Sequence, residues 1–415
     1  MIALAQRLFD RLRADGFDGT GITRDSFGAG ESRALAIVEA EAQSLGLATE
    51  RDAGANLVVT LPGTHPSLPA IACGSHLDSV PQGGNYDGAA GVIAGLLALA
   101  RLRTDNITPR RTIRLYALRG EESAAFGRAY MGSSALFGQL SAADLALPHL
   151  ATGRTLGDCM REVGADIARI TRGERLLDPA SLAAWLELHI EQGPVLTARR
   201  LPVAIVTGIR GNFRHRNVTC LGEAGHSGAV PRWLRHDAVF AVAALLTELD
   251  RSWQAVLAAG DDLVVTTGVL GTDPAEHALA RIPGRVGFSF EARSQSPATL
   301  EAFHALFVDE CRRVEEERGV RFVLDRRIDT DPAQMDRTWI ERLSAIVRDL
   351  GLPDEPMPSG AGHDAAVFAN VGVPSAMIFV RNANGSHNPQ EAMAMEDFMA
   401  GAEVLYRAVV EGAPT

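Results

Sequence analysis

The most informative absence in this sequence is lysine. All 40 basic side chains are arginines, in a chain of 415 residues that carries 51 acidic side chains and a formal net charge of −11. Without lysine, the chain cannot form a lysine Schiff base, anchor pyridoxal phosphate or build a Walker-type phosphate loop. An acidic chain that lacks a basic block is also a poor ligand for nucleic acid or for anionic membranes. We therefore expect neither nucleic acid nor a membrane as a partner.

Cysteine and long apolar runs are scarce as well. The four cysteines are scattered, at Cys73, Cys159, Cys220 and Cys311. Because no two of them form a CxxC pair, the pattern favours neither a cysteine-based zinc site nor a disulfide framework, and it indicates a reducing compartment. Near the N-terminus, Leu4, Leu8 and Leu12 have helical spacing, which predicts an amphipathic helix rather than a signal peptide. No apolar run reaches the roughly 20 residues that span a bilayer, so we expect a cytoplasmic protein.

Short apolar runs alternate with helical patterns in the first half of the chain. Residues 70–75 and 112–118 predict buried strands, and residues 88–102 between them predict a helix. Strand, helix and strand in that order are typical of a mostly parallel sheet that is covered by helices. The predicted fold class is therefore α/β.

The middle of the chain has a different pattern. Two long helices are predicted at residues 236–253 and 296–317. Strands are predicted from residue 212 and at residues 263–270, 284–294 and 320–328. The last part returns to the first pattern, with a helix at 338–351 and a strand at 374–380. We expect a catalytic domain formed by residues 1–208 and 331–415, into which a smaller α+β lid or dimerisation domain, residues 209–330, is inserted.

Carboxylates and imidazoles follow the apolar strands or lie in glycine-rich turns. They are His76, Asp78, Asp87, Glu121, Glu122, His189 and His387. Any one of them alone is more often a surface or structural residue than a ligand. Their shared position indicates a functional site, because the functional residues of a parallel sheet lie where its strands end. Imidazoles together with carboxylates suit zinc, cobalt or manganese, and adjacent glutamates can supply one metal ligand and one proton acceptor.

Six motifs occur in an order that points to a known family. They are GSHLDSVPQGGNYDGAAGV, the Glu-Glu pair after a strand, LHIEQGPVL, GHSGAVP followed by R.DA, SGAGHDA, and SHNP. From about residue 20 to residue 410, the chain resembles the dinuclear-metal amidohydrolases of the hydantoinase/carbamoylase branch, which are relatives of the aminoacylase and carboxypeptidase metallopeptidases. That branch includes N-carbamoyl-L-amino-acid hydrolases, allantoate amidohydrolases and β-ureidopropionases.

The resemblance implies a centre with two divalent metal ions in each chain. His76 and His387 would hold one ion, Glu122 and His189 the other, and Asp87 would bridge the two. Zinc is the first expectation, with manganese, cobalt and nickel as alternatives. Asp78 would fix the orientation of the His76 imidazole.

The resemblance also implies roles in catalysis and substrate binding. Glu121 would be the general base, and His226 would stabilise the tetrahedral oxyanion, often from the partner of a homodimer. Arg293 would bind the carboxylate of a small-molecule substrate, and Gln192 would contact its ureido end. For His363 a supporting role and a structural role both stay open.

The implied reaction is hydrolysis of the C–N bond of an N-carbamoyl-L-amino acid or a related ureido acid, which releases ammonia, carbon dioxide and the amino acid. Three segments with substrate-recognising positions depart from the family pattern, at residues 123–126, 226–231 and 277–284. They lack an arginine, two threonines and the asparagines that the family carries there. The alternative is therefore an N-acyl-amino-acid amidohydrolase or a dipeptidase of the same group. A binding protein on an inactive hydrolase fold is disfavoured because every expected ligand and the base are present.

Overall fold

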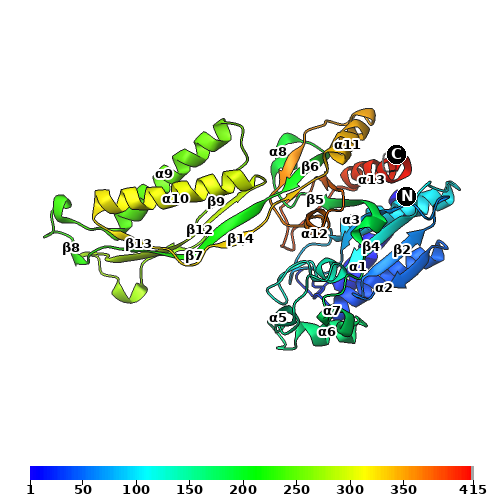
Figure 1. The fold of residues 1–415 in the computed structure, drawn as a ribbon, viewed down its shortest axis with the longest axis horizontal. Coiled ribbons are helices and arrows are strands. Elements are labelled where there is room, and N and C mark those ends of the chain that lie inside the picture. Colours follow the sequence, from blue (N-terminus) through cyan, green and yellow to red (C-terminus); the bar gives the residue numbers. More distant parts are fainter. Residues whose placement is uncertain (413–415) are drawn as a thin grey trace. The chain divides into compact units, whose positions relative to one another are not determined.

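The computed structural model describes residues 1–412 and divides into two compact units (Figure 1). The first unit comprises residues 1–209 together with the chain from Gln334 onward, and the second comprises Arg210–Ala333. Each unit contains its own sheet, its own helices and its own cluster of buried apolar side chains.

The first unit is built on a mixed sheet whose centre is parallel. The strands are β1 (Ala48–Arg51), β2 (Leu57–Leu61), β3 (Ala70–His76), β4 (Ile113–Leu118), β5 (Leu182–Ile190), β6 (Val203–Ile209), β15 (Ala333–Gln334), β16 (Met357–Ser359) and β17 (Ser375–Val380). Strands β4, β3, β5 and β17 are neighbours in that order and run parallel. Antiparallel pairs join β1, β2 and β6 to the sheet. The predicted α/β fold with a largely parallel sheet is confirmed, and the antiparallel edges are an addition to it.

The helices of the first unit include one that is almost entirely buried. The longer helices are α1 (Ile2–Gly16), α2 (Ala29–Ser44), α3 (Ala89–Thr104), α11 (Arg337–Asp349) and α13 (Met395–Glu411). The shorter ones are α4 (Met131–Leu136), α5 (Ala142–Leu145), α6 (Leu156–Glu162), α7 (Ile167–Thr171), η1 (Pro179–Ser181), α8 (Val195–Arg199) and α12 (Asp364–Asn370). Helix α3 is apolar on all sides and is therefore buried, and a Cβ at Gly91 would lie 2.3 Å from the Leu188 carbonyl oxygen. Small residues thus let α3 approach the sheet closely. Among the described helices, none combines the length and apolarity needed to cross a bilayer.

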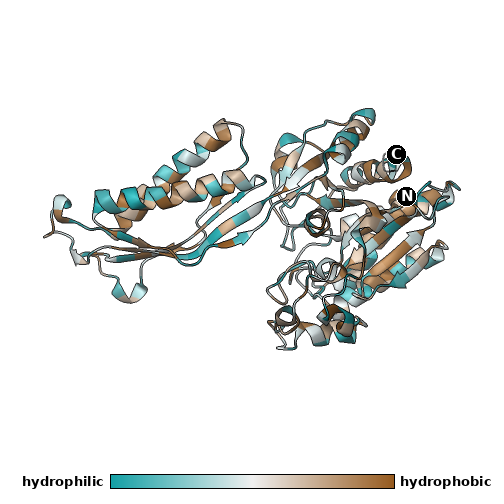
Figure 2. Ribbon diagram, in the orientation of Figure 1, coloured by the Kyte–Doolittle hydropathy of each residue, from teal (hydrophilic) through white to brown (hydrophobic). Residues whose placement is uncertain are grey.

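The second unit has a six-stranded antiparallel sheet, a separate two-stranded sheet and two long helices. Its strands are β7 (Gly211–Leu221), β8 (Gly225–His226), β9 (Val264–Thr266), β10 (Leu270–Gly271), β11 (Arg281–Ile282), β12 (Arg285–Ser294), β13 (Arg321–Val323) and β14 (Ile328–Thr330). The two-stranded sheet is formed by β8 and β11. Its helices are η2 (Arg232–Leu234), α9 (Ala238–Ala258), η3 (Pro274–Glu276) and α10 (Pro297–Arg318). The hydrophilic and hydrophobic turns of α9 and α10 alternate along each helix (Figure 2). Phe213, Phe288 and Phe307 belong to the apolar cluster of this unit.

Two of the strands predicted in the second unit are interrupted. The segment 263–270 forms β9 and β10 rather than one strand, because β9 and β10 pair with β12 in registers that differ by one residue. The segment 320–328 is broken as well, and the Asp325 carboxylate accepts hydrogen bonds from the Arg216 and Asn217 backbone N–H groups at the break. Both differences arise from pairing with distant strands, which periodicity does not report.

A buried ion pair stabilises the chain just before the two glutamates. Glu31 in α2 accepts hydrogen bonds from Arg119 Nη1 at 2.5 Å and from the Gly120 and Phe27 backbone N–H groups, both at 2.8 Å. The carboxylate of Glu31 is fully buried and the Arg119 side chain almost so. Removing one partner of such a pair leaves a buried charge without compensation.

We expect Glu31→Ala to lower the free energy of unfolding by about 3–5 kcal/mol. Urea denaturation followed by circular dichroism would measure it. The control is Glu162→Ala, which removes the partner of Arg154 from a solvent-exposed ion pair and should leave stability almost unchanged. Equal stability of the two variants would show that Glu31 does not neutralise Arg119.

Candidate metal centre

The predicted metal ligands lie together at the carboxyl edge of the first unit's sheet. Each ligand position is set by a strand or by the loop that follows it. His76 ends β3, Glu122 follows β4, His189 is near the end of β5, His387 follows β17, and Asp87 precedes α3. Parallel pairing aligns these ends, with His76 opposite Leu118 and His189 opposite Phe379. The sheet therefore brings together side chains that are up to 311 positions apart in the chain.

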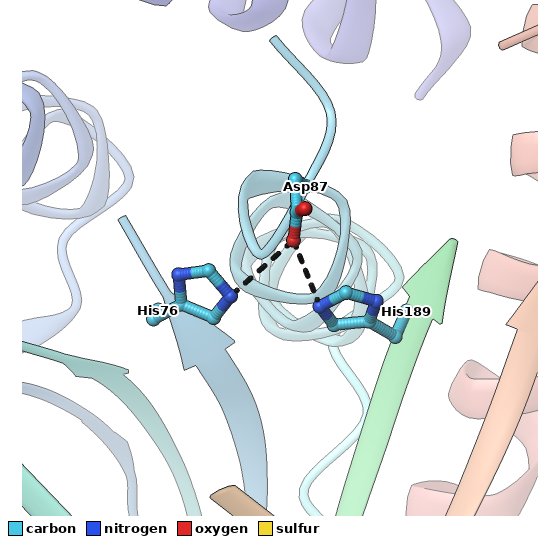
Figure 3. A group of neighbouring side chains, drawn as sticks. All are labelled: His76, Asp87 and His189. Atoms are coloured by element: carbon cyan, nitrogen blue, oxygen red, sulfur yellow. Dashed lines mark ion pairs between the residues drawn. The ribbon is translucent and has the colours of Figure 1, made fainter. Parts of the chain in front are cut away.

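Asp87 is at the centre of the cluster. Its Oδ1 lies 3.5 Å from His76 Nε2 and 3.3 Å from His189 Nε2 (Figure 3). Its Oδ2 lies 3.4 Å from His387 Nε2, which is also 3.2 Å from Glu122 Oε1. The five side chains thus form two groups of potential ligand atoms that share Asp87.

The structure pairs these ligands differently from the expectation. The resemblance implies that His76 pairs with His387 and Glu122 with His189, whereas the geometry groups His76 with His189 and Glu122 with His387. The physical reason is the strand order. Strands β3 and β5 are neighbours, so their two histidines face the same oxygen of Asp87.

The residues present fit a divalent cation. Asp87 Oδ1 and His189 Nε2 are buried, and neither has a hydrogen-bond partner among the described residues. Buried polar atoms are nearly always satisfied, and a cation would satisfy both of these. Hydrogen bonds to Asp87 and Glu122 raise the pKa of His387 to about 10, which shows how strongly the cluster attracts positive charge. Imidazole nitrogens and carboxylate oxygens are suitable ligands for such an ion.

Asp78 is completely buried and connects His76 to the two glutamates. Its Oδ1 lies 3.2 Å from His76 Nδ1 and accepts the Glu121 backbone N–H at 3.1 Å. Its Oδ2 accepts the Glu122 backbone N–H at 3.1 Å and the Ser26 hydroxyl at 2.6 Å. One carboxylate therefore orients an imidazole and fixes the turn that carries both glutamates.

The predicted base, Glu121, lies within the cluster. Its Oε2 is 3.8 Å from His76 Nε2, and the side chain is almost fully buried. Burial raises the pKa of Glu121, and the neighbouring charges of Glu122 and Asp364 raise it further, against the opposing effect of His76. Such a carboxylate is suited to accept a proton and to release it again.

Gln192 and His363 border the same cluster. Gln192 Nε2 donates to Asp87 Oδ2 at 2.8 Å, while the buried Gln192 Oε1 has no hydrogen-bond partner among the described residues. His363 Nε2 lies 2.9 Å from Ser359 Oγ, and the His363 ring is 4.3 Å from that of His189. Burial lowers the pKa of His363 well below its ordinary value, and the nearby His189 imidazole lowers it further.

Sequence reasoning missed several side chains that contact the centre. Glu187 could hold a metal ion together with His189 and His363, and it accepts the Ser75 hydroxyl at 2.8 Å. The signal for Glu187 was present, because residues two apart in a strand share a face and Glu187 lies two before His189. Ser386 and Glu391 also contact Asp87; Ser386 belongs to the SHNP motif, although no role was expected for it, and no pattern marked Glu391.

His226 and Arg293 belong to the second unit, where they lie far apart. His226 is exposed in β8, opposite Arg281, and its Nδ1 accepts the Gly228 backbone N–H at 3.2 Å. Arg293 is near the other end of β12 and forms an ion pair with Glu291. Because β12 is ten residues long and starts directly after the β8–β11 pair, roughly 30 Å of strand separates the two.

Comparison with known proteins identifies the family. The Peptidase family M20/M25/M40 matches residues 72–411, a range that includes every ligand of the candidate centre. The chain belongs to this family. The resemblance inferred from its motifs is therefore confirmed.

The similarity of this M20/M25/M40 chain to its relatives covers nearly its whole length. An N-carbamoyl-L-amino acid amidohydrolase of Geobacillus stearothermophilus is 34% identical and covers 97% of both chains. An allantoate amidohydrolase of Escherichia coli is 32% identical and covers 87% of this chain and 85% of its own. The crystal structure of a hydantoinase/carbamoylase family amidase from Burkholderia ambifaria is 30% identical, with a TM-score of 0.89, and covers 100% of this chain and 96% of its own.

Proposed function

We propose that the protein is a metal-dependent amidohydrolase of N-carbamoyl-L-amino acids or related ureido acids. It hydrolyses a C–N bond that is not a peptide bond and releases ammonia, carbon dioxide and the amino acid. The observation that carries the proposal is the cluster of ligands around Asp87, in which Asp87 Oδ1 and His189 Nε2 have no hydrogen-bond partner within residues 1–412. The names of the full-length relatives support the choice of ureido substrates.

The proposed cofactor is a pair of divalent ions, with zinc as the first choice and manganese, cobalt or nickel as alternatives. His76 and His189 would hold one ion with Asp87 Oδ1, and Glu122 and His387 would hold the other with Asp87 Oδ2. When bound, such ions polarise the scissile carbonyl and make water more acidic. The donor set does not select strongly among these metals.

The proton transfers are assigned to Glu121. Its carboxylate takes a proton from the attacking water as the new C–O bond forms at the carbamoyl carbon. It then gives that proton to the amino-acid nitrogen as the C–N bond breaks, which regenerates the base and releases the amino acid and carbamic acid. The carbamic acid then decomposes to ammonia and carbon dioxide. Asp78 supports the proton transfers because it holds the backbone of Glu121 and Glu122 in place.

The remaining assignments concern the substrate. The Gln192 amide oxygen has no hydrogen-bond partner in the part of the chain that the structure describes, so it can accept an N–H of the ureido group. Arg293 is assigned to the substrate carboxylate, because a guanidinium can bind it through two hydrogen bonds. His226 is assigned to the oxyanion that develops during attack.

We propose that the protein acts as a homodimer, with the second unit as its lid and dimerisation domain. The separation of His226 and Arg293 along β12 supports this proposal. A small ureido acid is much shorter than that separation, so one substrate can contact both residue types only if they come from two chains. The second unit also exposes large apolar side chains, notably Trp233 and Phe240, which a second copy of the chain can cover.

A second candidate activity is hydrolysis of N-acyl amino acids or dipeptides. It is favoured by the segment after the two glutamates, where the family arginine is missing. Ala125 and Phe126 in that segment are buried in an apolar cluster and offer no hydrogen bond to a ureido group.

We expect the purified protein to release ammonia from N-carbamoyl-L-amino acids. Activity should be lost after dialysis against a chelator and regained when zinc or manganese is added. A coupled ammonia assay with matched ureido, N-acetyl and dipeptide forms of the same amino acids would measure this. Turnover of the N-acetyl or dipeptide forms without ammonia from any ureido form would replace the first candidate with the second.

A further inference from the structure

The two oxygens of the Asp87 carboxylate have different surroundings. Oδ2 is 2.6 Å from the Ser386 hydroxyl and 2.8 Å from Gln192 Nε2, and both groups donate to it. Oδ1 has no hydrogen-bond donor among the described residues. Rotation of the carboxylate would therefore break two charge-assisted hydrogen bonds.

Glu391 contacts the backbone of Asp87 and also the serine that donates to the Asp87 side chain. Its Oε1 accepts the Tyr86 backbone N–H at 2.8 Å and the Asp87 backbone N–H at 3.2 Å. Its Oε2 lies 2.6 Å from Ser386 Oγ, so the same carboxylate contacts the group that donates to the Asp87 side chain. Glu391 is buried directly against Gly84, where an added Cβ would lie 2.0 Å from the Glu391 carboxyl carbon. The lack of a side chain at Gly84 thus leaves the space that the Glu391 carboxylate occupies.

Asn382 links Gln192 to the loop that carries Ser386. Its Oδ1 accepts the Gln192 backbone N–H at 3.0 Å, and its Nδ2 donates to the Gly385 carbonyl at 2.7 Å. Gln192 has a φ of +64°, a conformation that non-glycine residues seldom adopt without local support. These hydrogen bonds, together with the peptide link from Gly385 to Ser386, connect Asp87 through Ser386 and Asn382 back to Gln192.

We propose that Ser386 and Glu391 are positioning residues that fix the Asp87 carboxylate for the two ligand groups. The inference rests on the proposed metal centre. Ser386 contacts Oδ2, the oxygen that is grouped with Glu122 and His387, and it directly precedes His387 in the chain. Loss of the Ser386 hydroxyl therefore affects the ion at Oδ2 more than the ion that His76 and His189 hold with Oδ1.

The test is a zinc titration of metal-stripped protein by competition with a fluorescent chelator. Changes around metal ligands typically weaken binding by 10–100-fold, so Ser386→Ala should raise the Kd of one zinc by roughly that factor. The Kd of the other zinc should change by less than about twofold, and His387→Ala should identify which zinc is affected. Ser386→Thr retains the hydroxyl and should restore most of the affinity.

Three further variants make the result interpretable. Ser344→Ala removes a buried hydroxyl in α11 and should leave both zinc Kd values unchanged. Glu391→Gln keeps an acceptor for the two backbone N–H groups and can donate to Ser386, so it should weaken zinc binding less than Glu391→Ala. Comparison of Glu391→Gln with Glu391→Ala also tests the proposal if Ser386→Ala does not fold.

The outcomes separate this inference from the proposed function. If His387→Ala leaves both zinc Kd values unchanged, the proposed metal centre is wrong. If His387→Ala removes one zinc but Ser386→Ala weakens neither zinc, or both equally, the centre stands and the positioning role is wrong.

Discussion

Replacement of Glu121 by glutamine should lower kcat by roughly a thousandfold without removing the metal ions. Glutamine has nearly the same shape, and the Asp78 hydrogen bonds to the backbone of Glu121 and Glu122 do not involve the changed side chain. What the variant loses is a group that can accept and return a proton. Steady-state kinetics, together with metal analysis by mass spectrometry, would measure both properties.

The matched control is Glu396→Gln, an exposed glutamate in the first turn of α13. It should keep both turnover and metal content. If Glu121→Gln retained near-normal turnover, the base would have to be another carboxylate of the cluster. If it lost its metal ions instead, Glu121 would be a ligand rather than a base.

Much of the first unit could be predicted because its signals are local. The buried strands β3 and β4 and the helix α3 follow from short apolar runs and helical spacing. The convergence of His76 and Glu122 at one edge then follows from parallel strands, whose carboxyl ends meet. The strand ends and glycine-rich turns also mark Asp87, His189 and His387 as candidates, and the family motifs then assign them as metal ligands.

The assignment of ligands to each group could not be predicted in the same way. It depends on the order β4, β3, β5, β17, in which only β3 and β4 are successive strands in the sequence. Strand order is set by packing of whole strands and crossover helices, and no single motif reports it. The same limit applies to Ser386 and Glu391, whose contact with Asp87 joins segments about 300 residues apart.

The separation of His226 and Arg293 along β12 makes it testable whether His226 acts on the site of the other chain. His226→Ala should lose roughly 100- to 1000-fold in kcat, as expected for one oxyanion donor. If His226 acts on the site of the other chain, a dimer of one Glu121→Gln chain and one His226→Ala chain contains one complete site. That site combines Glu121 of the second chain with His226 of the first.

Co-expression of the two variants with different affinity tags should therefore restore activity that neither variant has alone. Random pairing makes half of the dimers mixed, and each mixed dimer has one complete site of two, so about a quarter of wild-type activity is expected. Isolated mixed dimers should reach about half. The control pairs the Glu121→Gln variant with a chain that carries both substitutions, and that pair should stay inactive. If His226 instead acts within its own chain, every site of a mixed dimer lacks one of the two groups. The absence of any recovery in verified mixed dimers would then assign both functions to a single chain.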